Sequence, residues 1–212
     1  MIIKRGFTSD DGNFTPIEAG MHTCVCYGII DVGIQENKFD AGKESHRVVI
    51  LWETQELLET KDGIKKPRIL TCEYTLSLNE RSTLFAMLTG WRGKPFTDEE
   101  LEGFDLKQIL GKPCLINVQH HVSKANGRIY ARVSGVSPLL KGMAAPKQIL
   151  DTIYFTLDKD GLNKLDTLPS CWQRKIQESK TYKLLVGGGA TTKTQSGMTV
   201  NNNYATDENL PF

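Results

Sequence analysis

The chain has 212 residues, of which 39% are hydrophobic and 24% are charged, and its formal net charge at pH 7 is +1. This balance is usual for a globular protein that can bury a sizeable core. No window approaches the roughly 18 uninterrupted apolar residues of a membrane span, so we expect no spanning helix.

Five cysteines are an odd number and follow no tight framework of the kind that disulfide-rich domains show. The opening residues Met-Ile-Ile-Lys-Arg lack the apolar stretch of a signal peptide. We therefore expect a cytoplasmic location, with free and mostly buried thiols.

The first half of the chain alternates strand patterns with turn signals. Residues 1–20, rich in Gly, Asp, Thr and Pro, are interpreted as an arm. Runs of β-branched and aromatic residues predict strands over 22–34, closing at Gly33, over 45–54 and over 68–78.

A helical pattern follows the third strand. Asn79 is expected to cap a helix that Gly90 ends, and Thr97 with Glu100 forms a capping box for a second short helix. Another helical turn is expected over residues 105–110.

Two further strands, over 114–123 and 128–136, flank an Asn-Gly pair, which is the strongest short hairpin signal. Three strands, a helical connection and a hairpin follow one another in the order of an OB-fold, a five-stranded Greek-key barrel. The predicted fold class is therefore mainly β with α insertions.

Beyond this hairpin, a strand is expected over 152–157 and a helix that Pro169 opens. A Gly, Thr, Ser and Asn-rich stretch then predicts disorder. The domain organisation expected is an arm (1–20), an OB-like barrel (21–138), a strand–helix extension packed on the barrel with a C-terminal helix (139–186), and a flexible linker with a terminal tip (187–212).

The charge distribution is more informative than the total. Residues 106–150 contain no carboxylate but seven basic side chains: Lys107, Lys112, Lys124, Arg128, Arg132, Lys141 and Lys147. A polyanion is the natural partner of such a field. The alternative is an ordinary hairpin with a solvated charged surface.

Strand alternation sorts this segment into two faces. Cys114, Ile116, Val118 and Val122, together with Ile129, Ala131 and Val133, form the apolar phase. The opposite phase combines cations, an aromatic ring and amides, which suits single-stranded nucleic acid because cations neutralise phosphates and flat rings stack on unpaired bases. His120 and His121 point to opposite faces, one to the rim or core and the other to the groove.

Aromatic residues elsewhere could extend the binding path, and Trp52 and Tyr74 could equally be core residues. The candidate DNA-binding residues are Lys112, Asn117, Gln119, His121, Lys124, Arg128, Tyr130, Arg132, Trp52, Tyr27, Phe39 and Tyr74.

The chain ends in Asp207, Glu208, Asn209, Leu210, Pro211 and Phe212. An apolar terminal ring, its α-carboxylate and upstream acids form a compact peptide ligand. This ending resembles that of bacterial single-stranded DNA-binding proteins, which finish in acids followed by Ile-Pro-Phe or Leu-Pro-Phe. The resemblance implies that Asp207, Glu208, Leu210, Pro211 and Phe212 recruit replication, recombination and repair proteins. Asn209 interrupts the acids, which departs from that pattern.

The body of the chain resembles tailed-phage (bacteriophage) replication-associated proteins instead. The resemblance is carried by WRGKPFTDEELEGFDLKQILGKPC (Trp91–Cys114) and, more loosely, by SLNERSTLFAMLTG (Ser77–Gly90) and LPSCWQRKIQES (Leu168–Ser179). It implies a phage-encoded protein with an OB core that coats and protects single-stranded DNA in the host cytoplasm.

No nucleophile motif, paired catalytic phrase or four-ligand metal pattern is found, so we expect no enzyme activity, no cofactor and no metal. Two other functions stay open: an adaptor that uses the barrel for protein contacts, and a nuclease or recombination enzyme. The sequence leaves the oligomeric state open.

Overall fold

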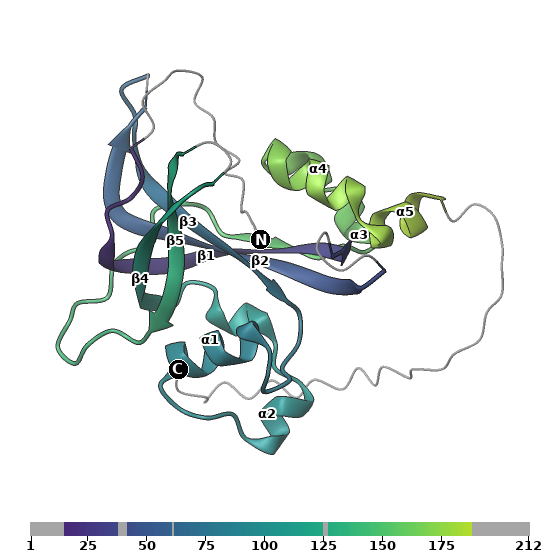
Figure 1. Ribbon diagram of the computed structural model, residues 1–212, viewed down its shortest axis with the longest axis horizontal. Coiled ribbons are helices and arrows are strands. Elements are labelled where there is room, and N and C mark those ends of the chain that lie inside the picture. Colours follow the sequence, from purple (N-terminus) through teal and green to yellow (C-terminus); the bar gives the residue numbers. More distant parts are fainter. Residues whose placement is uncertain (1–14, 38–41, 61, 125–126, 188–212) are drawn as a thin grey trace.

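The computed structural model describes residues 15–37, 42–60, 62–124 and 127–187. The fold is mainly β, with one six-stranded sheet and several short helices (Figure 1). The strands are β1 (Gly20–Glu36), β2 (Glu44–Glu59), β3 (Lys65–Thr75), β4 (Pro113–Val122), β5 (Ile129–Ser137) and β6 (Ile153–Phe155).

The order in the sheet is β3-β2-β1-β4-β5, with every pair antiparallel, while β6 pairs in parallel with β1. Because β4 pairs with the first part of β1 and β6 with its middle, both follow the same edge of β1. Among the described elements, β3 and β5 are therefore the two ends of the main sheet path.

The middle strands are buried on both faces, which explains why their sequences are apolar without a clear alternation. Val48, Ile50 and Trp52 of β2 face one core cluster, and Val49 and Leu51 face the other. The first cluster is covered by the helical connection after β3, and the second by the C-terminal helices.

The connection between β3 and β4 holds α1 (Thr83–Arg92), α2 (Asp98–Glu102) and the 3-10 turn η1 (Leu106–Ile109). The expected capping box is confirmed: the hydroxyl of Thr97 accepts from the Glu100 amide, and the Glu100 carboxylate accepts from the Thr97 amide. The expected cap at Asn79 and stop at Gly90 are wrong, because Ser82 caps α1 and Gly93 ends it in the left-handed conformation.

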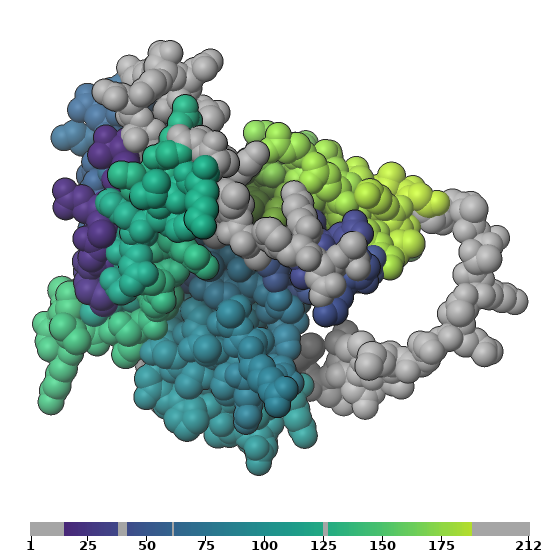
Figure 2. All heavy atoms as spheres, viewed as in Figure 1, coloured from purple at the N-terminus to yellow at the C-terminus, as the bar shows by residue number. Residues whose placement is uncertain are grey.

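The chain beyond β6 forms α3 (Lys159–Leu162), the turn η2 (Leu165–Thr167), α4 (Ser170–Glu178) and α5 (Lys180–Gly187). In Figure 1, α4 and α5 lie on the opposite side of β1 and β2 from α1 and α2. Ile176 of α4 is fully buried in the second cluster with Ile30 and Val32 of β1. Figure 2 shows the segment between β5 and β6, which includes residues 139–146, projecting from the body.

Irregularities in pairing change two expectations about the strands. β1 does not close at Gly33, because the register shifts between Asp31 and Gly33 and the strand continues to Glu36. Gly33 has φ of 73°, where a side chain would be strained, and its amide donates to the Asp31 carboxylate at 2.8 Å.

A second shift lies between Asn117 and Val118 of β4, where Ser134 is the extra residue of β5. Its hydroxyl donates to the Asn117 carbonyl at 2.9 Å. A bulge of this kind reverses the alternation beyond it. Val133 and Val136 thus both face the first core cluster.

Candidate nucleic-acid interface

A groove of about 1200 Å³ runs between the edge strands β3 and β5. β3 lines it with residues 69–75 and β5 with residues 130–136. The chain entering α1, from Ser77 to Met87, forms a third side, and Ile17 closes part of the lining. Sites for drug-sized ligands usually measure roughly 300–1,000 Å³, so the volume favours a ligand larger than that class.

The groove is electropositive. Arg47, Arg81, Lys124 and Arg132 line it, and Glu73 is the single carboxylate among the described lining residues. Four cations against one carboxylate attract an anionic ligand before any specific contact forms.

Glu73 is itself engaged by cations on two sides. Its side chain is 8% exposed and accepts from Arg47 Nε at 3.0 Å and from Lys175 Nζ of α4. Arg47 also donates to the Thr75 hydroxyl at 2.6 Å. The carboxylate therefore fixes the Arg47 guanidinium at the groove wall and ties α4 to β3.

Five of the residues expected from the sequence to bind DNA line this groove: Tyr74, His121, Lys124, Tyr130 and Arg132. The two adjacent histidines separate as expected. His121 lines the groove, whereas His120 is outside the lining and its ring bonds to the Ile17 carbonyl at 2.8 Å.

Three of the proposed aromatic platforms are core residues in the structure. Trp52 is 0% exposed and packs against Trp91 with ring centroids 6.2 Å apart. Tyr27 is 5% exposed in the second cluster, and Tyr74 is 6% exposed in the first. Burial raises the pKa of both tyrosine hydroxyls. Stacking on Trp52 or Tyr27 is therefore ruled out in this conformation, and Tyr74 lines the groove with little exposed surface.

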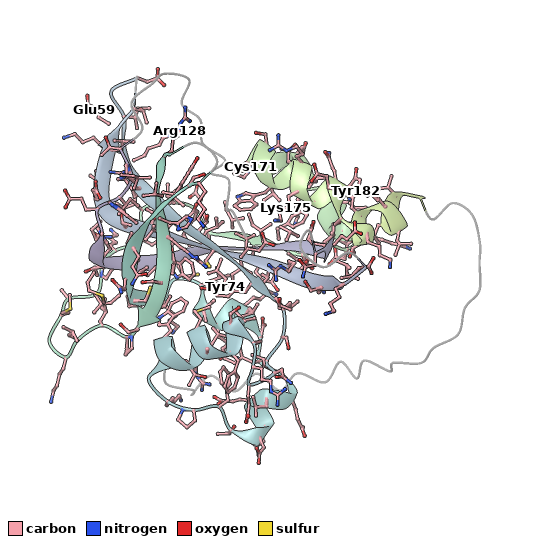
Figure 3. The ribbon with its side chains drawn as sticks, in the orientation of Figure 1. Glu59, Tyr74, Arg128, Cys171, Lys175 and Tyr182 are labelled. Atoms are coloured by element: carbon pink, nitrogen blue, oxygen red, sulfur yellow. The ribbon has the colours of Figure 1, made fainter. Side chains whose placement is uncertain are left out.

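Four other expected residues lie outside the groove lining: Lys112, Asn117, Gln119 and Arg128. The Lys112 carbonyl accepts from the Cys26 amide at the junction of β1 and β4. Arg128 lies near the tip of the β4–β5 hairpin, at the end away from Tyr74 (Figure 3). Phe39 and the terminal residues Asp207, Glu208, Leu210, Pro211 and Phe212 lie outside the described residues.

The alternation of buried and exposed side chains along the β4–β5 hairpin fails beyond the core. Val122 and Ile129 pair with each other but are 57% and 46% exposed, because this end of the hairpin extends past the first cluster. Leu115 alternates with Cys114 and Ile116 and would therefore point to the outer face, but it is buried, because β4 lies between β1 and β5 there.

Sequence reasoning missed Arg47 and Arg81. The sequence signal for Arg47 is a cation directly before the apolar run of the strand SHRVVILWET. The signal for Arg81 is its place directly before Ser82, which caps α1. Neither reveals its place in the groove until β3 is paired with β2 and α1 is packed on β5.

All five cysteines are free thiols, with Cys24, Cys26 and Cys114 buried. Burial raises the pKa of Cys24 and of Cys26 to about 12, so neither forms a reactive thiolate near neutral pH. No cluster of three or more metal-ligating side chains is found in the described part of the chain. Nor is any helix within those residues long and apolar enough to cross a bilayer.

No family model matches the chain, and no curated protein sequence is significantly similar to it.

Proposed function

We propose that this protein binds single-stranded DNA, largely without regard to sequence, in the groove between β3 and β5. The observation that carries the proposal is the lining of that groove: four cations, one neutralised carboxylate and the ring of Tyr130. The acid-free segment 106–150 supplies two of these cations, Lys124 and Arg132.

The fold we propose is a partly open OB barrel, completed where β3 and β5 approach. Support comes from the strand order β3-β2-β1-β4-β5, in which β3 and β5 are the edges that a five-stranded barrel would bring together. The helical connection lies between β3 and β4, and the OB-fold binds oligonucleotides on strands two and three and in the neighbouring loops.

A single strand fits this lining better than a duplex does. Hydroxyl and amide side chains of Thr71, Ser77 and Asn79 can contact sugars and base edges, and Tyr130 offers a half-buried ring to an unpaired base. A duplex hides the base faces, so it would gain only the phosphate contacts.

The binding proposal is tested by titrating a fluorescein-labelled dT oligonucleotide of about 30 nucleotides, and the dT·dA duplex of equal length, without divalent metal. Fluorescence anisotropy is read at about 50 and 200 mM salt. If three or four groove cations each neutralise a phosphate, affinity for the single strand falls by about 20- to 50-fold over that range.

Preference for the single strand, with the oligonucleotide left intact, supports the proposal. Absence of binding at low salt contradicts it and favours the adaptor function. Degradation of the oligonucleotide on adding magnesium or manganese would instead indicate a nuclease.

We also propose that the terminal residues Asp207 to Phe212 recruit partner proteins of replication, recombination or repair, in a protein that is not an enzyme and serves phage DNA metabolism. The support is the resemblance of this ending to that of bacterial single-stranded DNA-binding proteins. Deleting Phe212 should leave affinity for the dT oligonucleotide unchanged or slightly raised. A large loss of affinity would contradict a tip that serves partners alone.

A further inference from the structure

Gly135 is an exposed glycine in the middle of β5, within the groove lining. It pairs with Asn117 and directly follows the bulge residue Ser134. The alternation of side chains between the two faces of β5 is therefore interrupted next to Gly135. Its main chain is therefore presented to the groove without a side chain.

Nothing within the described chain requires glycine at this position. A Cβ atom built on Gly135 meets no heavy atom within 4 Å, and its φ lies outside the left-handed region that favours glycine. Glycine inside a strand weakens it, and often marks a place where another molecule approaches the backbone closely.

The surroundings of Gly135 indicate which part of a nucleotide would approach. Thr83, Ala86 and Met87 of α1 and Val136 of β5 belong to the same groove lining. α1 packs on β5 next to Gly135, since a Cβ atom built on Gly90 would lie 3.1 Å from the carbonyl oxygen of Val136. These side chains are small or apolar and uncharged, which suits a base, whereas phosphates are drawn to the groove cations.

We infer that Gly135 is the contact point at which an unpaired base of the bound strand lies flat on the main chain of β5, beside α1. The inference rests on the proposed binding of single-stranded DNA in this groove. On this inference Gly135 contacts the base through its main chain, and a side chain introduced at this position would fill the space that the base occupies.

The test is a series of substitutions, Gly135→Ala, Gly135→Val and Gly135→Leu, titrated with the labelled dT oligonucleotide. Displacement of one base from this position predicts about a tenfold or greater rise in Kd for the larger two residues, with a smaller rise for alanine. Urea unfolding should show each variant to be as stable as the unmodified chain or more stable, because a Cβ atom at Gly135 has open space and glycine weakens a strand.

The matched control is Gly103→Val, since Gly103 also has nothing within 4 Å of its Cβ position but lies outside the groove. It should bind like the unmodified chain. Unchanged affinity in Gly135→Val and Gly135→Leu overturns the inference while leaving the proposed function intact. If the unmodified chain does not bind the oligonucleotide, the proposed function and this inference fall together.

Discussion

At the scale of single residues, burial separates the aromatic side chains by role. Trp52 and Trp91 lie in one core cluster, whereas Tyr130 on β5 is half-buried and lines the groove. A ring can stack on a base only where its face is reachable, so Tyr130 is the best-placed aromatic residue for binding within the described chain.

Tyr130→Ala should weaken binding of the dT oligonucleotide by about 1–3 kcal/mol, the usual value of one base–ring stack. Tyr154→Ala is the matched control, because Tyr154 is also partly exposed but lies outside the groove. Equal affinities for the two variants, measured by anisotropy, would remove Tyr130 from the binding site.

His46 provides a prediction about pH. Its ring bonds to the Asp31 carboxylate at 2.6 Å, and this hydrogen bond raises the pKa of His46 above its ordinary value of 6.5. Because the folded-state pKa is the higher one, the charged pair stabilises the fold fully below about pH 6.5, and that contribution is lost as pH rises through the folded-state pKa.

His46→Gln should therefore lower the urea midpoint most at about pH 6 and least above the raised pKa. Urea unfolding of both chains across this range checks the sign. A difference between the chains that grows with pH would show that the Asp31–His46 charge pair does not stabilise the fold.

At the scale of the elements, the strands were largely predictable and their exact faces were not. The β-branched runs of β1 to β5 and the Asn-Gly signal identify the strands to within about three residues, except that β2 continues to Glu59, five residues beyond its expected end. Alternation then fails at particular places, because the bulge at Ser134 and the shift at Gly33 depend on pairing partners that are distant in sequence.

The residues of the candidate site likewise divide into those that the sequence predicts and those that depend on distant partners. Lys124, Tyr130 and Arg132 could be predicted, since they lie on one hairpin with a local charge pattern. Arg47 could not, because its place in the groove is set by Glu73 on β3 and by Lys175 on α4, which is 128 residues further along the chain than Arg47.

Glu53 helps to attach the extension after β5 to the sheet, together with the pairing of β6 with β1. Its fully buried carboxylate accepts from the Ile149 amide at 2.5 Å and from the Leu150 amide at 2.7 Å. Glu53→Gln replaces one acceptor with a donor that faces an amide. We expect a loss of about 1–3 kcal/mol in the free energy of unfolding.

The exposed Glu59→Gln on the same strand is the control and should change that free energy little. Urea unfolding measures both variants. If Glu53→Gln unfolds at the same urea concentration as the control, the carboxylate does not secure this segment.

At the scale of the whole molecule, a net charge of +1 conceals an uneven distribution. Of the seven cations in residues 106–150, Lys124 and Arg132 line the groove, while Lys141 and Lys147 are on the exposed segment after β5. A mechanism based on total charge and one based on the groove therefore predict different outcomes for the same change of charge.

The most direct measurement compares two double variants that change the net charge equally, Lys124→Glu/Arg132→Glu and Lys141→Glu/Lys147→Glu, in titrations of the dT oligonucleotide at about 50 mM salt. Binding in the groove predicts that the first loses about tenfold or more in affinity and has a shallower salt dependence, by roughly 0.7 in slope for each phosphate that is no longer neutralised. The second should stay close to the unmodified chain. Equal losses in both variants, or a greater loss in the second, would contradict binding in the groove between β3 and β5.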